Sequence, residues 1–150
     1  MKSLIIIPAY NEEACIEQTV RDILEHAPNF DYIVINDCSK DRTKEICEKN
    51  HFHYIDLPVN LGIGGAVQTG YKYACNHGYD YAVQVDGDGQ HDPRFLEQML
   101  QVMQEKKLDM LNWIPFLLPR KAFSRPGSCV VSGHQILYLA DPSADRKNHH

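Results

Sequence analysis

Short apolar runs alternate with segments of helical periodicity along the first 110 residues. The apolar runs predict four buried strands, at 3–7 (SLIII, ended by Pro8), 32–36 (YIVIN), 53–57 (HYIDL) and 81–85 (YAVQV). Apolar residues recur at helical spacing in 16–27, 41–50, 66–76 and 95–103. Strict alternation with short connections predicts right-handed β-α-β units, and hence an α/β fold with a mostly parallel sheet flanked by helices.

Local sequence signals indicate how two of these helices begin. Ser39 is placed to cap the helix over 41–50. The helix over 66–76 follows a glycine-rich turn at 62–65 (GIGG), which either lets the backbone approach a diphosphate or starts the helix.

A polar cluster follows each predicted strand. The four clusters read PAYNEE, NDCSKD, LPVNLGIGG and DGDGQHD. Ligands of open parallel sheets bind outside the carboxyl ends of the strands, near a topological switch point. The coincidence of the four clusters with four strand ends therefore predicts one binding site at that edge.

Composition narrows the class of protein. The chain has 150 residues, of which 43% are hydrophobic and 23% charged, as expected for one globular domain. Its formal net charge of -5 argues against nucleic-acid binding.

Five dispersed cysteines without a C-x-x-C pair favour a reducing compartment. The first apolar run stops at Pro8, and no run reaches the roughly 18 residues of a membrane span. We therefore expect a cytoplasmic chain.

Three aspartates, Asp86, Asp88 and Asp92, crowd into the loop after the fourth strand, where like charges repel unless a cation is bound. A calcium-loop interpretation aligns Asp86 with the first ligand and Glu97 with the last. It has His91 where an EF-hand needs glycine, and a strand where it needs a helix. A dinucleotide-binding interpretation of Gly62–Gly65 lacks its third glycine, since Val67 stands there.

The third interpretation is an Asp-x-Asp metal site. Carboxylates on a tight loop at a strand end bind Mg²⁺ or Mn²⁺ through one or two oxygens, and water and substrate phosphate complete the shell. The glycines on either side of Asp88 keep side chains away from a diphosphate.

The four motifs IIIPAYNEE, VINDCSKDRT, NLGIGGAVQTGYKYA and VQVDGDGQHDP, in this order, resemble the N-terminal half of a family 2 glycosyltransferase over residues 1–110. That family has the GT-A nucleotide-sugar fold and includes dolichol-phosphate mannose synthases. The resemblance implies metal-dependent, inverting transfer from a UDP- or GDP-linked nucleotide-diphosphate sugar, in cell-wall or glycan biosynthesis. The acceptor it implies is a lipid phosphate or a glycan, so contact with a membrane is indirect.

The resemblance also implies roles for individual residues. Pro8, Tyr10 and Glu12 would border the nucleobase and ribose, and Asp37 would accept a hydrogen bond from the base or, alternatively, cap a helix. Asp86 and Gly87 would lie along the ribose and diphosphate. Asp88 and Gln90 would bind the metal ion. The catalytic base is not assigned.

The chain departs from the family pattern at three positions. Family members often have aspartate and glycine where this chain has Asn36 and Cys38, so contacts with the base are expected to differ. They often have lysine where Ile63 stands, which removes a positive contact with the diphosphate.

The pattern breaks at Leu111, and residues 111–150 are predicted to be an aberrant, poorly ordered tail that leaves the fold incomplete. A shifted reading frame of 111–150 gives strings closer to the family, so we hypothesise a one-base frame change near Leu111. Asp141 and Asp145 are the late acids, and neither is a credible catalytic base. A truncated, inactive enzyme, a non-catalytic nucleotide-binding remnant and a calcium-binding module stay open as alternatives.

Overall fold

The computed structural model describes residues 1–88, 92–106, 110–113 and 135–139. Its elements follow one another in the order β1 (Ser3–Ala9), α1 (Ile16–His26), β2 (Asp31–Asn36), α2 (Thr43–Lys49), β3 (Tyr54–Asp56), α3 (Gly62–Asn76), β4 (Tyr81–Gln84), η1 (Pro93–Phe95, a 3-10 turn), α4 (Leu96–Lys106), β5 (Met110–Trp113) and β6 (Gln135–Leu139). The first four strands alternate with helices, as the hydrophobic pattern predicts.

The six described strands form one sheet in the order β3-β2-β1-β4-β6-β5. The first four strands are mutually parallel, and β6 and β5 extend the sheet antiparallel beyond β4. The chain moves outward from β1 through β2 to β3 and then crosses to the other side of β1 to form β4. The topological switch point therefore lies between β1 and β4, and the predicted mostly parallel α/β sheet is confirmed.

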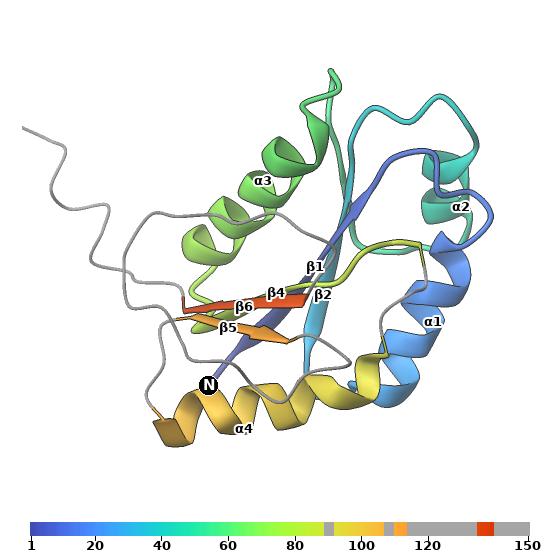
Figure 1. Cartoon of the computed structure of the whole chain (residues 1–150). Coiled ribbons are helices and arrows are strands. Elements are labelled where there is room, and N and C mark those ends of the chain that lie inside the picture. The colour runs from blue at the N-terminus through green and yellow to red at the C-terminus, as the bar shows by residue number, and fades with distance from the viewer. Residues whose placement is uncertain (89–91, 107–109, 114–134, 140–150) are drawn as a thin grey trace, which may run out of the picture.

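Helices cover both faces of the sheet (Figure 1). Because successive residues of a strand point to opposite faces, Ile5 and Ile7 of β1 pack into a core with α1, α2 and α4, while Leu4 and Ile6 face α3. All four side chains are fully buried. This two-sided burial explains why β1 has a continuous apolar run and not an alternating pattern.

Helix α3 lies close against β1 at Gly70. A Cβ atom added at Gly70 would overlap the side chain of Ile6, so only glycine permits this approach. The close packing holds the first turn of α3 at the carboxyl edge of the sheet.

Two expected element boundaries are wrong. Strand β1 continues through Pro8 to Ala9, and Pro8 pairs in register with Ile35 of β2. The pairing of β1 with β4 covers only Ser3–Ile6, so the N–H that proline lacks falls beyond the end of that ladder. Helix α3 begins at Gly62 and not at Ala66, so the glycine-rich segment forms its first turn.

Ser39 does not cap α2, which begins at Thr43. The Ser39 hydroxyl instead donates to Asn36 Oδ1 at 2.5 Å and accepts the N–H of Asn11 at 3.0 Å. The N-cap position of α2 is Arg42, which makes no side-chain cap hydrogen bond; Asp41 Oδ1 accepts the N–H of Thr43, the first residue of α2, at 2.9 Å.

Part of the region predicted to be aberrant belongs to the sheet, since β6 pairs with β4 and β5 pairs with β6. The rest of 111–150, with Asp141 and Asp145, lies outside the described residues, so the frame-change hypothesis stays a prediction. Among the helices that the structure describes, none has the length and apolar character needed to cross a bilayer.

Candidate nucleotide-sugar site

A cavity of about 350 Å³ lies at the carboxyl edge of the parallel strands. Segments after β1, β2, β3 and β4 all contribute to it, as the four polar clusters predict. Its lining residues are Pro8, Ala9, Tyr10, Glu12, Asp37, Asn60, Gly62, Ile63, Ala66, Asp86, Gly87 and Asp88. All seven residues expected to contact the nucleotide sugar therefore line one cavity, whereas Gln90 lies outside the described residues.

Residues 86–88 follow shortly after β4, and Gly87 lies against Pro8 and Glu12 of the β1–α1 connection. Gly87 is buried, and its carbonyl accepts a hydrogen bond from the Thr19 hydroxyl at 3.2 Å. A Cβ atom at Gly87 would stand 3.3 Å from the carbonyl oxygen of Pro8, so a larger residue would require one of the two to shift by a few tenths of an ångström. Because a strand precedes the loop, the calcium-loop interpretation is wrong for the described residues: an EF-hand requires a helix there.

Asp37 is held at the end of β2 by contacts with two other segments. Its N–H donates to the carbonyl of Ala9 at 2.9 Å, which continues the pairing of β1 with β2. Its Oδ1 accepts the N–H of Leu61, just before α3, at 2.7 Å. Its carbonyl accepts a hydrogen bond from Asn60 Nδ2 at 3.2 Å. The carboxylate is therefore fixed between strand β2 and helix α3.

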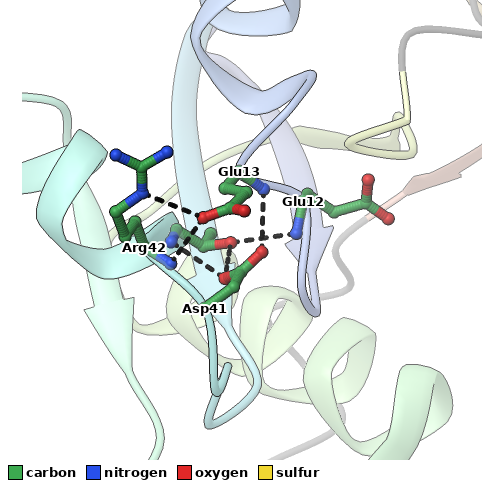
Figure 2. A network of polar contacts seen from close by, with 5 residues as sticks. Glu12, Glu13, Asp41 and Arg42 are labelled. Atoms are coloured by element: carbon green, nitrogen blue, oxygen red, sulfur yellow. Dashed lines mark hydrogen bonds and ion pairs between the residues drawn. The ribbon is translucent and has the colours of Figure 1, made fainter.

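Two loops lock together beside the cavity, and we call residues 11–13 and 39–43 the loop clamp (Figure 2). The N–H of Glu12 donates to Thr43 Oγ1 at 2.9 Å, and the N–H of Glu13 donates to Asp41 Oδ2 at 3.0 Å. In return, the N–H of Arg42 donates to Glu13 Oε2 at 3.0 Å. Figure 2 shows the Glu12 carboxylate directed away from these contacts, so the clamp fixes the backbone and leaves the side chain to the cavity.

The cavity is strongly negative. Four of its lining residues are acidic, namely Glu12, Asp37, Asp86 and Asp88, and none of its described lining residues is Lys, Arg or His. Burial raises the pKa of Glu12 above 4.5, and the negative charges of Asp88, Asp41 and Asp86 raise it further. The surroundings of Glu12 therefore disfavour its ionised form, and a cation in the cavity would offset the repulsion between these carboxylates.

The carboxylates are not arranged as a complete metal cage. Among the described residues, no group of three or more His, Cys, Asp or Glu side chains is placed to hold a metal ion. Gln84 Nε2 donates to Asp86 Oδ1 at 2.9 Å, which orients one of the carboxylates. Mg²⁺ is commonly bound through one or two carboxylates with substrate phosphates and water, so the oxygen ligands present suit such an ion without a cage.

On the α3 side of the cavity, the sequence pointed to the Gly62–Gly65 turn and Ile63 as neighbours of a diphosphate, but it did not point to Asn60 or Ala66. Asn60, Gly62, Ile63 and Ala66 form this wall. The LPVNLGIGG cluster was the available signal, because it follows a strand as the other three clusters do.

Comparison with known proteins agrees with this geometry. The model of the family described as "Glycosyl transferase family 2" matches residues 4–114. The chain belongs to this family. The match includes all four strand-end segments that line the cavity and ends within one residue of β5.

Two relatives whose names state an activity are similar to this chain. The chain is 30% identical over 165 residues to an undecaprenyl-phosphate mannosyltransferase of Micrococcus luteus, covering 94% of this chain and 68% of that protein. It is 37% identical over 115 residues to a UDP-N-acetylglucosamine–dolichyl-phosphate N-acetylglucosaminyltransferase of Methanococcus voltae, covering 65% of this chain and 45% of that one.

Solved structures of glycosyltransferases share the fold. S. aureus TarS 1-349 in complex with UDP-GlcNAc matches with a TM-score of 0.62 and 26% identity, over 74% of this chain and 33% of that one. The mannosyltransferase PcManGT from Pyrobaculum calidifontis, in complex with GDP-Man and Mn²⁺, matches with a TM-score of 0.65 and 18% identity, over 75% and 35%. The chain thus spans about a third of each solved chain.

Proposed function

We propose that this family 2 chain binds a nucleotide-diphosphate sugar together with Mg²⁺ or Mn²⁺ and transfers the sugar, with inversion, to an acceptor hydroxyl or phosphate. The observation that carries the proposal is the convergence of the segments after four parallel strands on one acidic cavity. A cavity with four carboxylates and no described basic side chain would repel a diphosphate on its own. A divalent cation removes that conflict.

The chain's own residues divide the work in this proposal. Tyr10 offers a flat apolar surface to the base, and Asp37 accepts a hydrogen bond from it. Asp86 and Asp88 supply oxygen ligands, and Gly87 keeps the loop backbone close to the β1–α1 connection. When bound, the metal ion acts as a Lewis acid that neutralises charge on the departing nucleoside diphosphate.

For the acceptor we propose a lipid phosphate. The proposal is supported by the relatives, whose names specify undecaprenyl phosphate and dolichyl phosphate. No residue is assigned as the catalytic base or to the acceptor groove.

The test is calorimetric titration of the chain with UDP and GDP, with and without Mn²⁺, followed by a transfer assay with a polyprenyl phosphate. We expect nucleotide binding only with Mn²⁺, and a loss of at least about tenfold in affinity in Asp88→Ala. Asp22→Ala is the matched control, because it also removes a carboxylate but lies on α1 outside the cavity. Metal-dependent binding without transfer would identify a non-catalytic remnant, and binding unaffected by Asp88→Ala would contradict the site.

A further inference from the structure

A threonine occupies a core position of helix α1. Thr19 lies with Ile16, Val20 and Ile23 on the buried face of the helix and is 5% exposed. A threonine in a helix often bonds back to the carbonyl four residues earlier. The Thr19 hydroxyl instead donates at 3.2 Å to the carbonyl of Gly87, 68 residues further along the chain. The helical spacing calls for an apolar residue at this position, and the hydroxyl is explained by its bond to Gly87.

Gln84 of β4 is a second buried polar residue of this kind. It pairs in register with Ile6 of β1 and is 7% exposed. Its side chain points to the same face of the sheet as that of Ala82, which belongs to the core under α3. Gln84 Nε2 donates at 2.9 Å to Oδ1 of Asp86, in the acidic loop formed by residues 86–88. A buried amide is costly unless it is hydrogen-bonded, and the acidic loop provides this bond.

The two side chains reach the acidic loop from opposite faces of the sheet. Helix α1 covers one face, and Gln84 points to the face that α3 covers. Their acceptors, Asp86 and Gly87, are consecutive residues that line the cavity, whereas Thr19 and Gln84 are not among its described lining residues. Because the peptide unit is planar, fixing the Gly87 carbonyl also fixes the direction of the N–H of Asp88.

We propose that Thr19 and Gln84 are positioning residues, which hold the acidic loop in the geometry that binds a metal ion together with a diphosphate. This inference rests on the proposed function and adds to it two residues outside the cavity. Gln84 orients the carboxylate of Asp86, and Thr19 fixes the backbone that leads to Asp88. Loss of a partner that orients a metal-binding group typically weakens metal binding about ten- to a hundredfold.

A role in packing alone predicts a different result. Valine has nearly the shape of threonine, and methionine nearly the length of glutamine. Thr19→Val and Gln84→Met therefore keep most of the packing and remove one hydrogen-bond donor each. If the two side chains only filled space, both variants would bind nucleotide as the unmodified chain does.

The first test is calorimetric titration with UDP and with GDP at one fixed Mn²⁺ concentration, at a temperature at which thermal unfolding shows every variant to be folded. For whichever nucleotide the unmodified chain binds, we expect Gln84→Met to weaken binding about tenfold and Thr19→Val about five- to tenfold. Thr19→Ser keeps the hydroxyl and should recover most of the affinity.

Two changes elsewhere in the chain are the matched controls. Gln18 Nε2 donates to Asp22 Oδ1 at 2.6 Å on α1, and the Thr69 hydroxyl donates to the carbonyl of Gly65 at 2.8 Å within α3. Gln18→Met and Thr69→Val remove the same chemical groups and should leave the affinity unchanged.

Unchanged affinity in folded Thr19→Val or Gln84→Met would overturn the role of that residue while leaving the proposed function intact. So would a loss in Thr19→Val that Thr19→Ser does not recover, in the case of Thr19. Binding of neither nucleotide by the unmodified chain would overturn both the inference and the proposed function.

The second test combines Thr19→Val with Gln84→Met. Because both residues hold one loop, releasing either leaves less for the other to fix. The double variant should therefore lose less affinity than the product of the two single losses. A loss equal to that product would show that the two residues act independently, contrary to a common role in holding the acidic loop.

Discussion

The side-chain amide of Asn36 donates to Oδ1 of Asp56 at 2.7 Å and thereby joins the end of β2 to the end of β3. Asn36 is almost fully buried, and Asp56 also pairs with Lys44 Nζ at 2.9 Å. An aspartate at position 36 would set two carboxylates at hydrogen-bond distance. Asparagine at this position can instead donate to Asp56.

We predict that Asn36→Asp lowers the free energy of unfolding by about 2–3 kcal/mol at neutral pH, because a donor is lost and a buried carboxylate is added. The loss should shrink in acid, where the pair shares a proton. Urea unfolding at the two pH values measures it. Adding Asp56→Asn reverses the direction of the hydrogen bond and should recover most of the loss; a double variant no more stable than Asn36→Asp would contradict the proposed pairing.

Cys38 has a left-handed backbone conformation, with φ at 56°. Residues with a Cβ atom adopt this region at a cost of about 1–2 kcal/mol, and glycine adopts it without that cost. We predict that Cys38→Gly raises the free energy of unfolding by about 0.5–1 kcal/mol, after the greater freedom of glycine in the unfolded chain is subtracted. Chemical denaturation measures the change.

Cys75→Gly is the matched control for this prediction, because Cys75 lies in helix α3 and is exposed. Glycine in a helix costs about 1 kcal/mol, so the control should change stability in the opposite direction. Two variants that lose stability equally would show that the conformation of Cys38 is not strained.

The strand pattern and the strand-end clusters were sufficient to predict the parallel sheet and the edge at which the cavity lies. They are local signals, and parallel topology then brings the strand ends together. The loop clamp could not be predicted, because the hydrogen bond from Glu12 to Thr43 joins loops whose relative register only the folded sheet sets. For the same reason Asp41, and not Ser39, emerges as the residue that accepts the first N–H of α2.

Asp41 is the central acceptor of the loop clamp, and this gives it a pH-dependent role. Burial opposes its ionisation, yet hydrogen bonds from the hydroxyl and N–H of Thr43 and from the N–H of Glu13 outweigh burial and lower the pKa of Asp41 below 3.8. A lowered carboxyl pKa adds stability above the unfolded-state value, and that stability is lost as pH falls through the folded-state value.

We therefore predict that Asp41→Asn, which keeps only one acceptor oxygen, lowers the free energy of unfolding by about 1–2 kcal/mol at neutral pH. The difference from the unmodified chain should disappear as pH falls below 3.8, the ordinary pKa of the group. Urea unfolding across this range measures it. A difference that is constant with pH would show that the lost stability does not depend on the charge of Asp41.

Glu12 should behave in the opposite way, because its pKa is raised by burial and by the charges of Asp88, Asp41 and Asp86. Ionised Glu12 costs stability above its usual pKa of 4.5, and the cost disappears as pH falls below that value. Glu12→Gln should therefore stabilise the metal-free chain at neutral pH by about 0.5 kcal/mol, after allowance for solvent screening, and have no such effect in acid.

The same change should weaken binding of the cation, because it removes one of the four carboxylates that attract it. We expect Mn²⁺ with UDP to raise the melting temperature of Glu12→Gln less than that of the unmodified chain, although the variant starts from a higher value. Glu25→Gln, an exposed change on α1, is the matched control and should alter neither temperature. If Glu12→Gln lowers the stability of the metal-free chain, the carboxylate makes a favourable contact there, and the repulsion inferred for the cavity is wrong.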